Sequence, residues 1–352
     1  MDLSGLHIGM VSWDYDPPIG GMGRHVKNLV TGLRSRGLNV SVLSGKDIKT
    51  FRCRNLGFSL TLKFRLRKWI KQNLIDVLHV HTGPGGVLLF DAAGIPTVVT
   101  ANHTYSRQSR LPGENWKRSL IPFERITYAC ADRVISISSD TAAAVGADYG
   151  IPREKISVIP CGFPLELWAG SDLEPDMRKL SVVFIGRPDK RKGWDILMSA
   201  WPKVLVSNPD AVLEVVGFDA GPVPGIRYLG KITDESLRKI VGESRLTVCP
   251  SRLEGFGLSA AQSIAAGTPV VASNVAGLRT TVKNWETGLL TKAEPETLAA
   301  AIRLALSDEM LWERLHAGCR ADRERFAAEE EIKSHIAVYN SIMDHSDNVG
   351  RK

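Results

Sequence analysis

The stretch PSRLEGFGLSAAQSIAAGTPVVAS, Pro250–Ser273, combines a loop, a helix start and a short apolar run. Glu254 stands just before Gly257, where the pattern predicts that a helix opens, and Gln262 follows within that helix. The free N–H groups and the positive dipole end of such a helix start suit a phosphate group. The apolar run Thr268–Ala272 predicts a buried parallel strand. This stretch therefore predicts an α/β protein with a polar cluster at the start of one helix.

Short apolar runs alternate with helix-length segments along the whole chain, which is typical of parallel sheets covered by helices. The strands predicted in the first half are His7–Ser12, Val40–Ser44, Val77–Val80, Thr97–Ala101, Arg133–Ser138 and Ile156–Ile159. Those predicted in the second half are Ser181–Ile185, Val212–Val216, Ile226–Leu229, Leu246–Cys249, Pro269–Ala272 and Gly288–Leu290. Between the halves, Pro160–Pro175 has no clear periodicity and is the predicted linker. We expect two Rossmann-like domains facing each other across a cleft.

Composition indicates a globular protein of two ordinary domains, with 352 residues of which 43% are hydrophobic. The five cysteines are widely scattered and lack metal-ligand spacing, which favours a reducing, cytoplasmic compartment. The apolar stretch Leu6–Trp13 is too short for a signal peptide, and no run has the length of a transmembrane helix. A net charge of +7 favours acidic partners, namely nucleotide diphosphates, nucleic acid or an anionic membrane, and charge alone does not choose among them. We expect no nucleic acid partner.

The densest basic stretch is KFRLRKWIK, Lys63–Lys71, in which apolar residues alternate with the charges. Two interpretations stay open. As a helix, this segment could lie on a membrane surface, or it could be a solvated helix covering the N-terminal sheet.

The loop after the first predicted strand carries Gly20, Gly21 and Gly23 ahead of an amphipathic helix. Glycines there let the backbone approach a ligand closely and leave N–H groups for an anion. A dinucleotide-binding fingerprint fails on spacing, because Val26 stands where a small residue is required and the loop is too long. Each glycine could also be a plain turn residue.

The first strand of the second half leads into SVVFIGRPDKRKGWDILMSA, Ser181–Ala200. Arg187 stands just past the strand, and Lys192 precedes a predicted helix start at Gly193. An arginine fork and a lysine point charge can neutralise the two charges of a diphosphate. Lys190 and Arg191 are interpreted as solvated surface charges.

Three histidines follow or lie in predicted strands of the first half. His103 ends the run VVTANHTY, while His79 and His81 lie in DVLHVHTG. His79 and His81 are interpreted as one histidine packed in the sheet and one at its end.

These motifs resemble the retaining glycosyltransferases of family 4, which have the GT-B fold. The family pattern is Glu, seven residues, Glu, then an alanine-rich turn and a Gly-x-Pro-Val-Val strand. In this chain the pattern begins at Glu254, has Gln262 in place of the second Glu, and ends with the strand at Gly267–Val271. The resemblance implies two Rossmann-like α/β/α domains: residues 1–165 bind the acceptor, and residues 176–320 bind the donor. It also implies a C-terminal helix within residues 321–352 that crosses back to the first domain, and we expect residues 321–343 to be helical throughout.

The resemblance also assigns roles to residues of this sequence. Glu254 is implied to contact the transferred sugar and His103 to lie near its reacting carbon, while Arg187 and Lys192 hold the diphosphate. The rest of the implied site is Gly255, Phe256, Gly257, Leu258 and Gln262 on the donor side, and Gly20, Gly21 and Gly23 in the loop bordering the diphosphate and the acceptor.

Gln262 departs from the family pattern, which has a second Glu at this position. In the family that Glu holds the ribose hydroxyls of the nucleotide. An amide both donates and accepts hydrogen bonds, so Gln262 could still bind a ribose. Two other interpretations stay open: a neutral substitution, or a family member that has lost activity.

The implied reaction moves a hexose from a UDP- or GDP-sugar to a hydroxyl acceptor, with retention of configuration. A retaining glycosidase would need two flanking carboxylates, and only Glu254 is well placed. No Asp-x-Asp pair stands in a plausible loop, so we expect neither a metal ion nor a cofactor. Two alternatives remain: another GT-B enzyme, such as a sugar-nucleotide epimerase or a phosphorylase, or a non-catalytic nucleotide-sugar-binding subunit. The acceptor, a glycan, a lipid-linked glycan or a small molecule, is not specified by the sequence, because acceptor specificity lies in variable loops.

Overall fold

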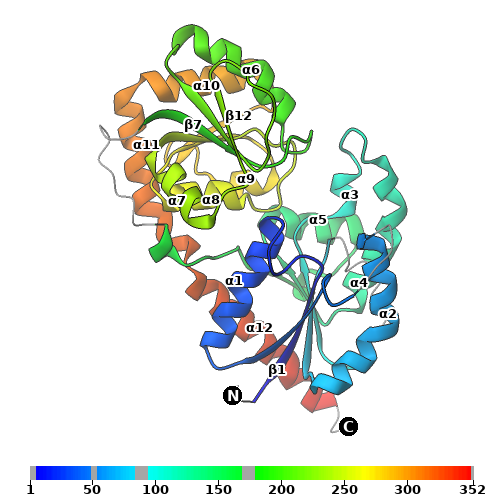
Figure 1. Ribbon diagram of the computed structural model, residues 1–352. Helices are drawn as coiled ribbons and strands as arrows, with labels where there is room; N and C mark the ends of the chain where they lie inside the picture. Colours follow the sequence, from blue (N-terminus) through cyan, green and yellow to red (C-terminus); the bar gives the residue numbers. More distant parts are fainter. Residues whose placement is uncertain (1–4, 49–53, 84–93, 169–178, 350–352) are drawn as a thin grey trace. The chain divides into compact units, whose positions relative to one another are not determined.

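The computed structural model describes residues 5–48, 54–83, 94–168 and 179–349. It divides into two compact units (Figure 1). The first unit comprises Met1–Phe163 and Ala328–Lys352, and the second comprises Pro164–Ala327. The predicted linker Pro160–Pro175 spans this passage, and its residues 169–175 lie outside the described residues.

The first unit is built on a six-stranded parallel sheet with strand order β2-β1-β3-β4-β5-β6. Its strands are β1 His7–Ser12, β2 Asn39–Ser44, β3 Val77–His81, β4 Thr97–Ala101, β5 Arg133–Ser136 and β6 Ile156–Val158. Its helices are α1 Gly21–Ser35, α2 Arg54–Asn73, α3 Tyr105–Gln108, α4 Ile121–Cys130, α5 Ser139–Tyr149 and α12 Ala328–Val349. Parallel strands need crossover connections, and helices provide most of them here.

Alternate strand residues of the first unit enter two separate cores, because successive side chains of a strand point to opposite faces. Met10 packs with α1 and α12 on one face of the sheet. Val11 packs with α2, α4 and α5 on the other face (Figure 1). Burial on both faces explains why the strands are continuous apolar runs.

The second unit repeats this design with strand order β12-β11-β10-β7-β8-β9, again all parallel. Its strands are β7 Lys179–Ile185, β8 Val212–Val216, β9 Ile226–Gly230, β10 Ser244–Cys249, β11 Val270–Ser273 and β12 Gly288–Thr291. Its α-helices are α6 Trp194–Ser207, α7 Asp234–Glu243, α8 Leu258–Ala265, α9 Ala276–Thr281, α10 Pro295–Ser307 and α11 Glu309–Asp322. The side chains of α6, α10 and α11 share one apolar core with the sheet.

All the predicted strands are confirmed, with ends that differ by at most two residues from those of the structure. The prediction that the C-terminal helix returns to the first unit is also confirmed, since α12 packs on α1. None of the helices in the described part of the chain is long and apolar enough to span a membrane.

The prediction that residues 321–343 form one continuous helix is wrong. Helix α11 ends at Asp322, a 3₁₀ turn spans Arg323–Phe326, and α12 begins at Ala328. Phe326 is buried beside the ring of Phe256, with 6.2 Å between the ring centroids. The packing of Phe326 on Phe256 marks the end of the second unit, and the chain returns to the first unit at Ala328.

Candidate functional site

Two loops of the second unit meet at the carboxyl edge of its sheet. Strands β7 and β10 are parallel neighbours, so the loops that follow them, residues 186–193 and 250–257, leave the sheet at the same edge. Gly193 has φ 70°, and a Cβ atom there would lie 1.8 Å from the Pro250 carbonyl oxygen. Glycine is therefore required for the loops to approach this closely.

The carboxylate of Glu254 is the centre of this loop pair. Its Oε1 accepts hydrogen bonds from Lys192 Nζ at 2.5 Å and from Ser251 Oγ at 2.9 Å. Its Oε2 lies 3.5 Å from a guanidinium nitrogen of Arg191. The side chains are only 11% exposed for Glu254, 19% for Lys192 and 20% for Arg191.

The charge state of Glu254 follows from this geometry. Burial raises the pKa of its carboxyl group, but Lys192 and then Arg191 outweigh burial and lower that pKa from 4.5 to about 2. The carboxylate is ionised at neutral pH, and it contributes acceptors only.

The same loops are held together by backbone contacts and a second ion pair. Arg252 forms a two-pronged pair with Asp195, at 2.6 and 2.8 Å, and its backbone N–H donates to the Arg191 carbonyl at 2.8 Å. Arg191 in turn donates to the Leu253 carbonyl at 3.2 Å. The position of Glu254 is therefore fixed by contacts along both loops.

The other donor-side residues have different environments. Arg187 is 73% exposed and pairs with Asp189 at 3.2 Å, while Lys192 lies against Glu254. Gly257 has φ 90° and begins α8 without a side-chain cap, as the sequence predicted for a helix start. Gln262 lies on α8 and is 3% exposed. Of the remaining residues in this predicted set, Gly255 and Phe256 are buried and Leu258 is half-buried.

In the first unit, the loop that carries Gly20, Gly21 and Gly23 binds the carboxylate of Asp14. The Asp14 carboxylate accepts hydrogen bonds from the backbone N–H groups of Ile19, Gly20 and Gly23, at 2.8, 2.9 and 3.2 Å. A Cβ atom on Gly23 would lie 2.3 Å from Asp14 Oδ1, so this glycine makes room for the carboxylate. The expectation that these N–H groups are left for an external anion is wrong for Gly20 and Gly23. Gly21 is the first residue of α1.

His103 is half-buried in the loop after β4. The segment that follows it is fixed by Glu124, a buried carboxyl group that accepts hydrogen bonds from Tyr105 N at 2.8 Å, from Tyr128 Oη at 3.1 Å and from Tyr149 Oη. Burial raises the pKa of Glu124 to about 7, against the lowering effect of these hydrogen bonds.

His79 is buried within β3, and His81 is buried as its last residue, which confirms one histidine packed in the sheet and one at its end. His79 hydrogen-bonds Tyr339 Oη and Thr100 Oγ1, each at 2.7 Å. His25 of α1 and Glu331 of α12 form an ion pair beside them.

The chain matches two family descriptions over most of its length. Residues 19–167 match Glycosyltransferase Family 4, and residues 171–321 match Glycosyl transferases group 1. A D-inositol 3-phosphate glycosyltransferase from Catenulispora acidiphila is 30% identical over 305 residues, which cover 76% of this chain and 73% of that protein.

The chain is a family 4 glycosyltransferase.

Solved structures show the fold of this glycosyltransferase. Sucrose-phosphate synthase from Thermosynechococcus elongatus superposes with a TM-score of 0.81 at 23% identity, covering 97% of this chain and 100% of that one. The Anabaena protein HepE, solved with UDP-glucose, superposes with a TM-score of 0.72 at 18% identity, covering 96% and 100%. The fold is GT-B, as the sequence predicted.

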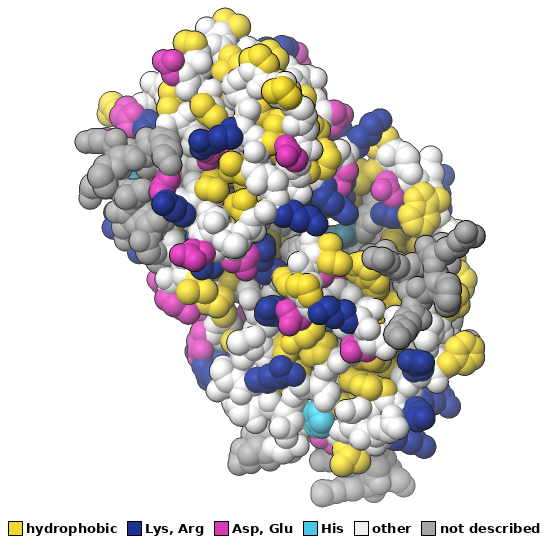
Figure 2. All heavy atoms as spheres, viewed as in Figure 1, with side chains coloured by type: hydrophobic (Ala, Val, Ile, Leu, Met, Phe, Trp, Pro, Cys, Tyr) yellow, Lys and Arg dark blue, Asp and Glu magenta, His cyan; other side chains and the backbone are white. Residues whose placement is uncertain are grey.

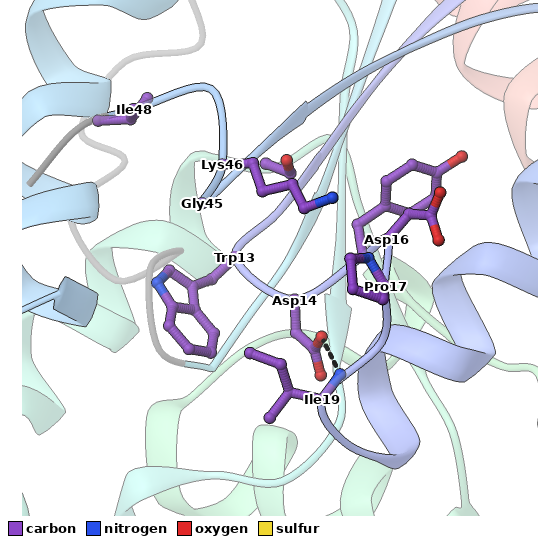
Figure 3. Close-up of a pocket in the computed structure, with 10 residues that line it drawn as sticks. Trp13, Asp14, Asp16, Pro17, Ile19, Gly45, Lys46 and Ile48 are labelled. Carbon is purple, nitrogen blue, oxygen red and sulfur yellow. Dashed lines mark hydrogen bonds between the residues drawn. The ribbon is translucent and has the colours of Figure 1, made fainter. Parts of the chain in front are cut away.

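A cavity of about 380 Å³ opens in the first unit of the glycosyltransferase, beside the glycine loop. Figure 3 shows the ring of Trp13 on one side and Pro17 with Asp16 on the other, while the ammonium of Lys46 reaches over the opening. Ile19 and Ile48 add apolar surface. Such a lining, mostly apolar with a few polar groups, is typical of small-molecule sites.

Sequence reasoning missed the role of Arg191, whose interpretation as a solvated charge is wrong. Its guanidinium points back to the Glu254 loop, and the partner residue lies far away in the sequence. The roles of Asp14 and Arg252 were also missed. The only signal for Asp14 is that it stands next to the first strand of the sheet, in a loop rich in glycine.

Proposed function

We propose that the glycosyltransferase moves a hexose from a nucleotide diphosphate sugar, a UDP- or GDP-sugar, to a hydroxyl acceptor with retention of the anomeric configuration. The observation that carries this proposal is the ionised, loop-held carboxylate of Glu254 beside the cations Lys192 and Arg191. A carboxylate can accept hydrogen bonds from the hydroxyls of a sugar, and the Lys192 ammonium can neutralise one charge of a diphosphate. HepE, which has the same fold, was solved with UDP-glucose.

In the proposed reaction, the acceptor hydroxyl attacks the anomeric carbon from the face that the diphosphate leaves. The bond from that carbon to the phosphate oxygen breaks, the bond to the acceptor oxygen forms, and the departing phosphate oxygen takes the acceptor proton. The protein holds both substrates and stabilises charge on the leaving group. We assign this stabilisation to Arg187 and Lys192 without a metal ion or cofactor, and we place His103 near the reacting carbon.

The identity of the donor is tested by measuring the melting temperature of the protein with UDP, GDP, ADP and TDP and with their nucleotide sugars. We expect one nucleoside diphosphate and its sugar to raise the melting temperature. The anomeric configuration of the product is then read by NMR. Inversion would contradict the proposed mechanism, and donor binding with neither transfer nor donor hydrolysis would favour a non-catalytic subunit.

We further propose that the cavity of the first unit receives the acceptor. Its exposed cation, Lys46, and its aromatic wall, Trp13, suit a ring-shaped acceptor with an anionic or hydroxyl-rich side. Trp13→Ala is expected to raise the acceptor KM while binding of the donor's nucleoside diphosphate stays unchanged. Loss of nucleoside diphosphate binding in this variant would contradict the assignment.

We also propose a peripheral contact between α2 and an anionic membrane, for an enzyme that works in the cytoplasm. Phe58, Leu62, Leu66 and Ile70 bury one side of this helix, whereas Phe64 is 81% exposed among the exposed Arg65, Arg67, Lys68 and Lys71. Figure 2 shows Lys and Arg side chains gathered where Figure 1 draws α2. Basic residues beside an exposed aromatic ring suit a headgroup layer. The free thiols, including the exposed Cys130, fit a reducing compartment.

Vesicle cosedimentation tests this contact. We expect binding to vesicles that contain phosphatidylserine, and loss of binding in Phe64→Asp. The matched control is Val206→Asp, which changes an exposed apolar residue of α6 in the second unit. Equal binding by both variants would show that α2 makes no such contact.

A further inference from the structure

Glu254 has two cationic partners, although one would balance its charge. Lys192 Nζ lies 2.5 Å from one carboxylate oxygen, and a guanidinium nitrogen of Arg191 lies 3.5 Å from the other. The group of three therefore carries a net positive charge. One of the cations is in excess of what Glu254 requires.

The two cations are held very differently. Arg191 is tied to the second loop, because its guanidinium donates to the Leu253 carbonyl and its own carbonyl accepts from Arg252 N. The Arg252–Asp195 pair holds this backbone in place. The Lys192 ammonium, in contrast, has no further hydrogen bond or ion pair with the described residues. It stands at the end of a flexible four-carbon stem, and it can move while Arg191 stays.

We propose that Arg191 is a positioning residue that allows Lys192 to exchange Glu254 for the diphosphate of the donor. This inference rests on the proposed function. When Lys192 turns to the diphosphate, Arg191 remains on Glu254 and keeps the carboxylate compensated and in place. A buried carboxylate without a cation is costly, so without Arg191 the ammonium of Lys192 is retained by Glu254. Arg191 thus strengthens diphosphate binding without touching the diphosphate.

A different role for Arg191 would be direct contact with the diphosphate. The two roles differ in their dependence on Glu254. If Arg191 acts through Glu254, its removal has no effect once residue 254 is neutral, because Lys192 is then already released. If Arg191 binds the phosphates itself, its removal weakens binding equally with or without the carboxylate.

A double-mutant cycle separates these roles, with UDP and GDP alone as the probes in titration calorimetry. The variants of the full-length chain are Arg191→Gln, Glu254→Gln and the two combined. The matched control is Lys190→Gln, which removes the same charge from the neighbouring, exposed position. Urea denaturation of each variant shows whether it is folded.

We expect Arg191→Gln to weaken nucleoside diphosphate binding about fivefold or more, a typical coupling between sites. Lys190→Gln should stay within about twofold of the wild type. Glu254→Gln should bind as tightly as the wild type or more tightly, and adding Arg191→Gln to it should change nothing further.

The same weakening in both backgrounds, or equal effects of Arg191→Gln and Lys190→Gln, would overturn the inference and leave the proposed function intact. Failure of the wild-type protein to bind either nucleoside diphosphate would overturn the proposed function itself.

Discussion

Arg187 and Lys192 belong to one loop but occupy different environments. Lys192 is largely buried on Glu254, while Arg187 is exposed beside Asp189. We expect Lys192→Ala and Arg187→Ala each to lower kcat/KM by about 100-fold or more, because each removes a cation that we propose stabilises the leaving group. Steady-state kinetics measure this, with Lys190→Ala as the control for net charge. Near-normal turnover in a folded variant would disprove its diphosphate role.

Gln262 is the residue in which this chain departs from the family pattern. We expect Gln262→Glu to tighten donor binding about fivefold, because hydrogen bonds from ribose hydroxyls to a carboxylate are stronger than those to an amide. Calorimetry with the donor nucleotide measures the change, and Gln262→Ala provides the comparison. Unchanged or weaker binding by Gln262→Glu would mean that Gln262 serves a different nucleotide preference.

Single residues also show where sequence reasoning ends. Glu254, Lys192 and Gly257, the N-cap residue of α8, were predicted because each lies at a fixed position in a local motif. The contacts of Arg191 and Asp14 depend on which loops meet in space. A charge in a basic run and an aspartate in a loop carry no local signal for such contacts, since both residue types are usually solvated.

The close approach of the loops after β7 and β10 depends on Gly193, the N-cap residue of α6. Gly193→Ala adds a Cβ atom 1.8 Å from the Pro250 carbonyl oxygen and places alanine at φ 70°. We expect a loss of about 2 kcal/mol or more in the free energy of unfolding, together with weaker donor binding. Urea denaturation measures the first effect. The control Gly221→Ala adds a Cβ atom in open space and should be neutral.

The strands were predictable at the scale of elements, whereas the break between α11 and α12 was not. Strands buried on both faces give continuous apolar runs that end at turn residues. Residues 323–327 instead have a composition that suits a helix. The break is set by the burial of Phe326 and by the hydrogen bond from Ala328 N to the Phe163 carbonyl, which are tertiary contacts.

The stability of the whole molecule should fall on acidification. Burial, followed by neighbouring histidines, lowers the pKa of His79 and His81 below 6.5, and burial also lowers that of His335 despite Glu331. These groups take up protons at a lower pH in the folded chain than in the unfolded chain, which takes them up near pH 6.5. Their contribution is therefore complete above pH 6.5 and is lost as the pH falls.

Two further groups act in the opposite direction. Burial lowers the pKa of His25, but Cys161 and Glu331 raise it by more, so its contribution is complete below pH 6.5 and is lost at higher pH. Glu124, with a pKa of about 7, holds a proton in the folded chain between pH 4.5 and 7. Below pH 6.5 three histidines favour proton uptake by the unfolded chain, whereas Glu124 alone favours uptake by the folded chain.

We expect the free energy of unfolding to decrease as the pH falls from 6.5 to 5, by on the order of 1 kcal/mol per pH unit. Urea denaturation from pH 7.5 to 5 measures the slope. His335→Gln removes one of the three histidines and should reduce it. A stability that rises on acidification would contradict the assignment of neutral histidines.

The return of α12 to the first unit has a consequence for synthesis of the chain. Ile332, Val338, Tyr339 and Ile342 complete the core that α1 shares with the sheet, yet they follow the entire second unit in sequence. We therefore expect one face of the first unit's core to stay open during synthesis until α12 has been made. The second unit, whose segments are contiguous, can complete its own core before the first unit does, although its sequence is translated later.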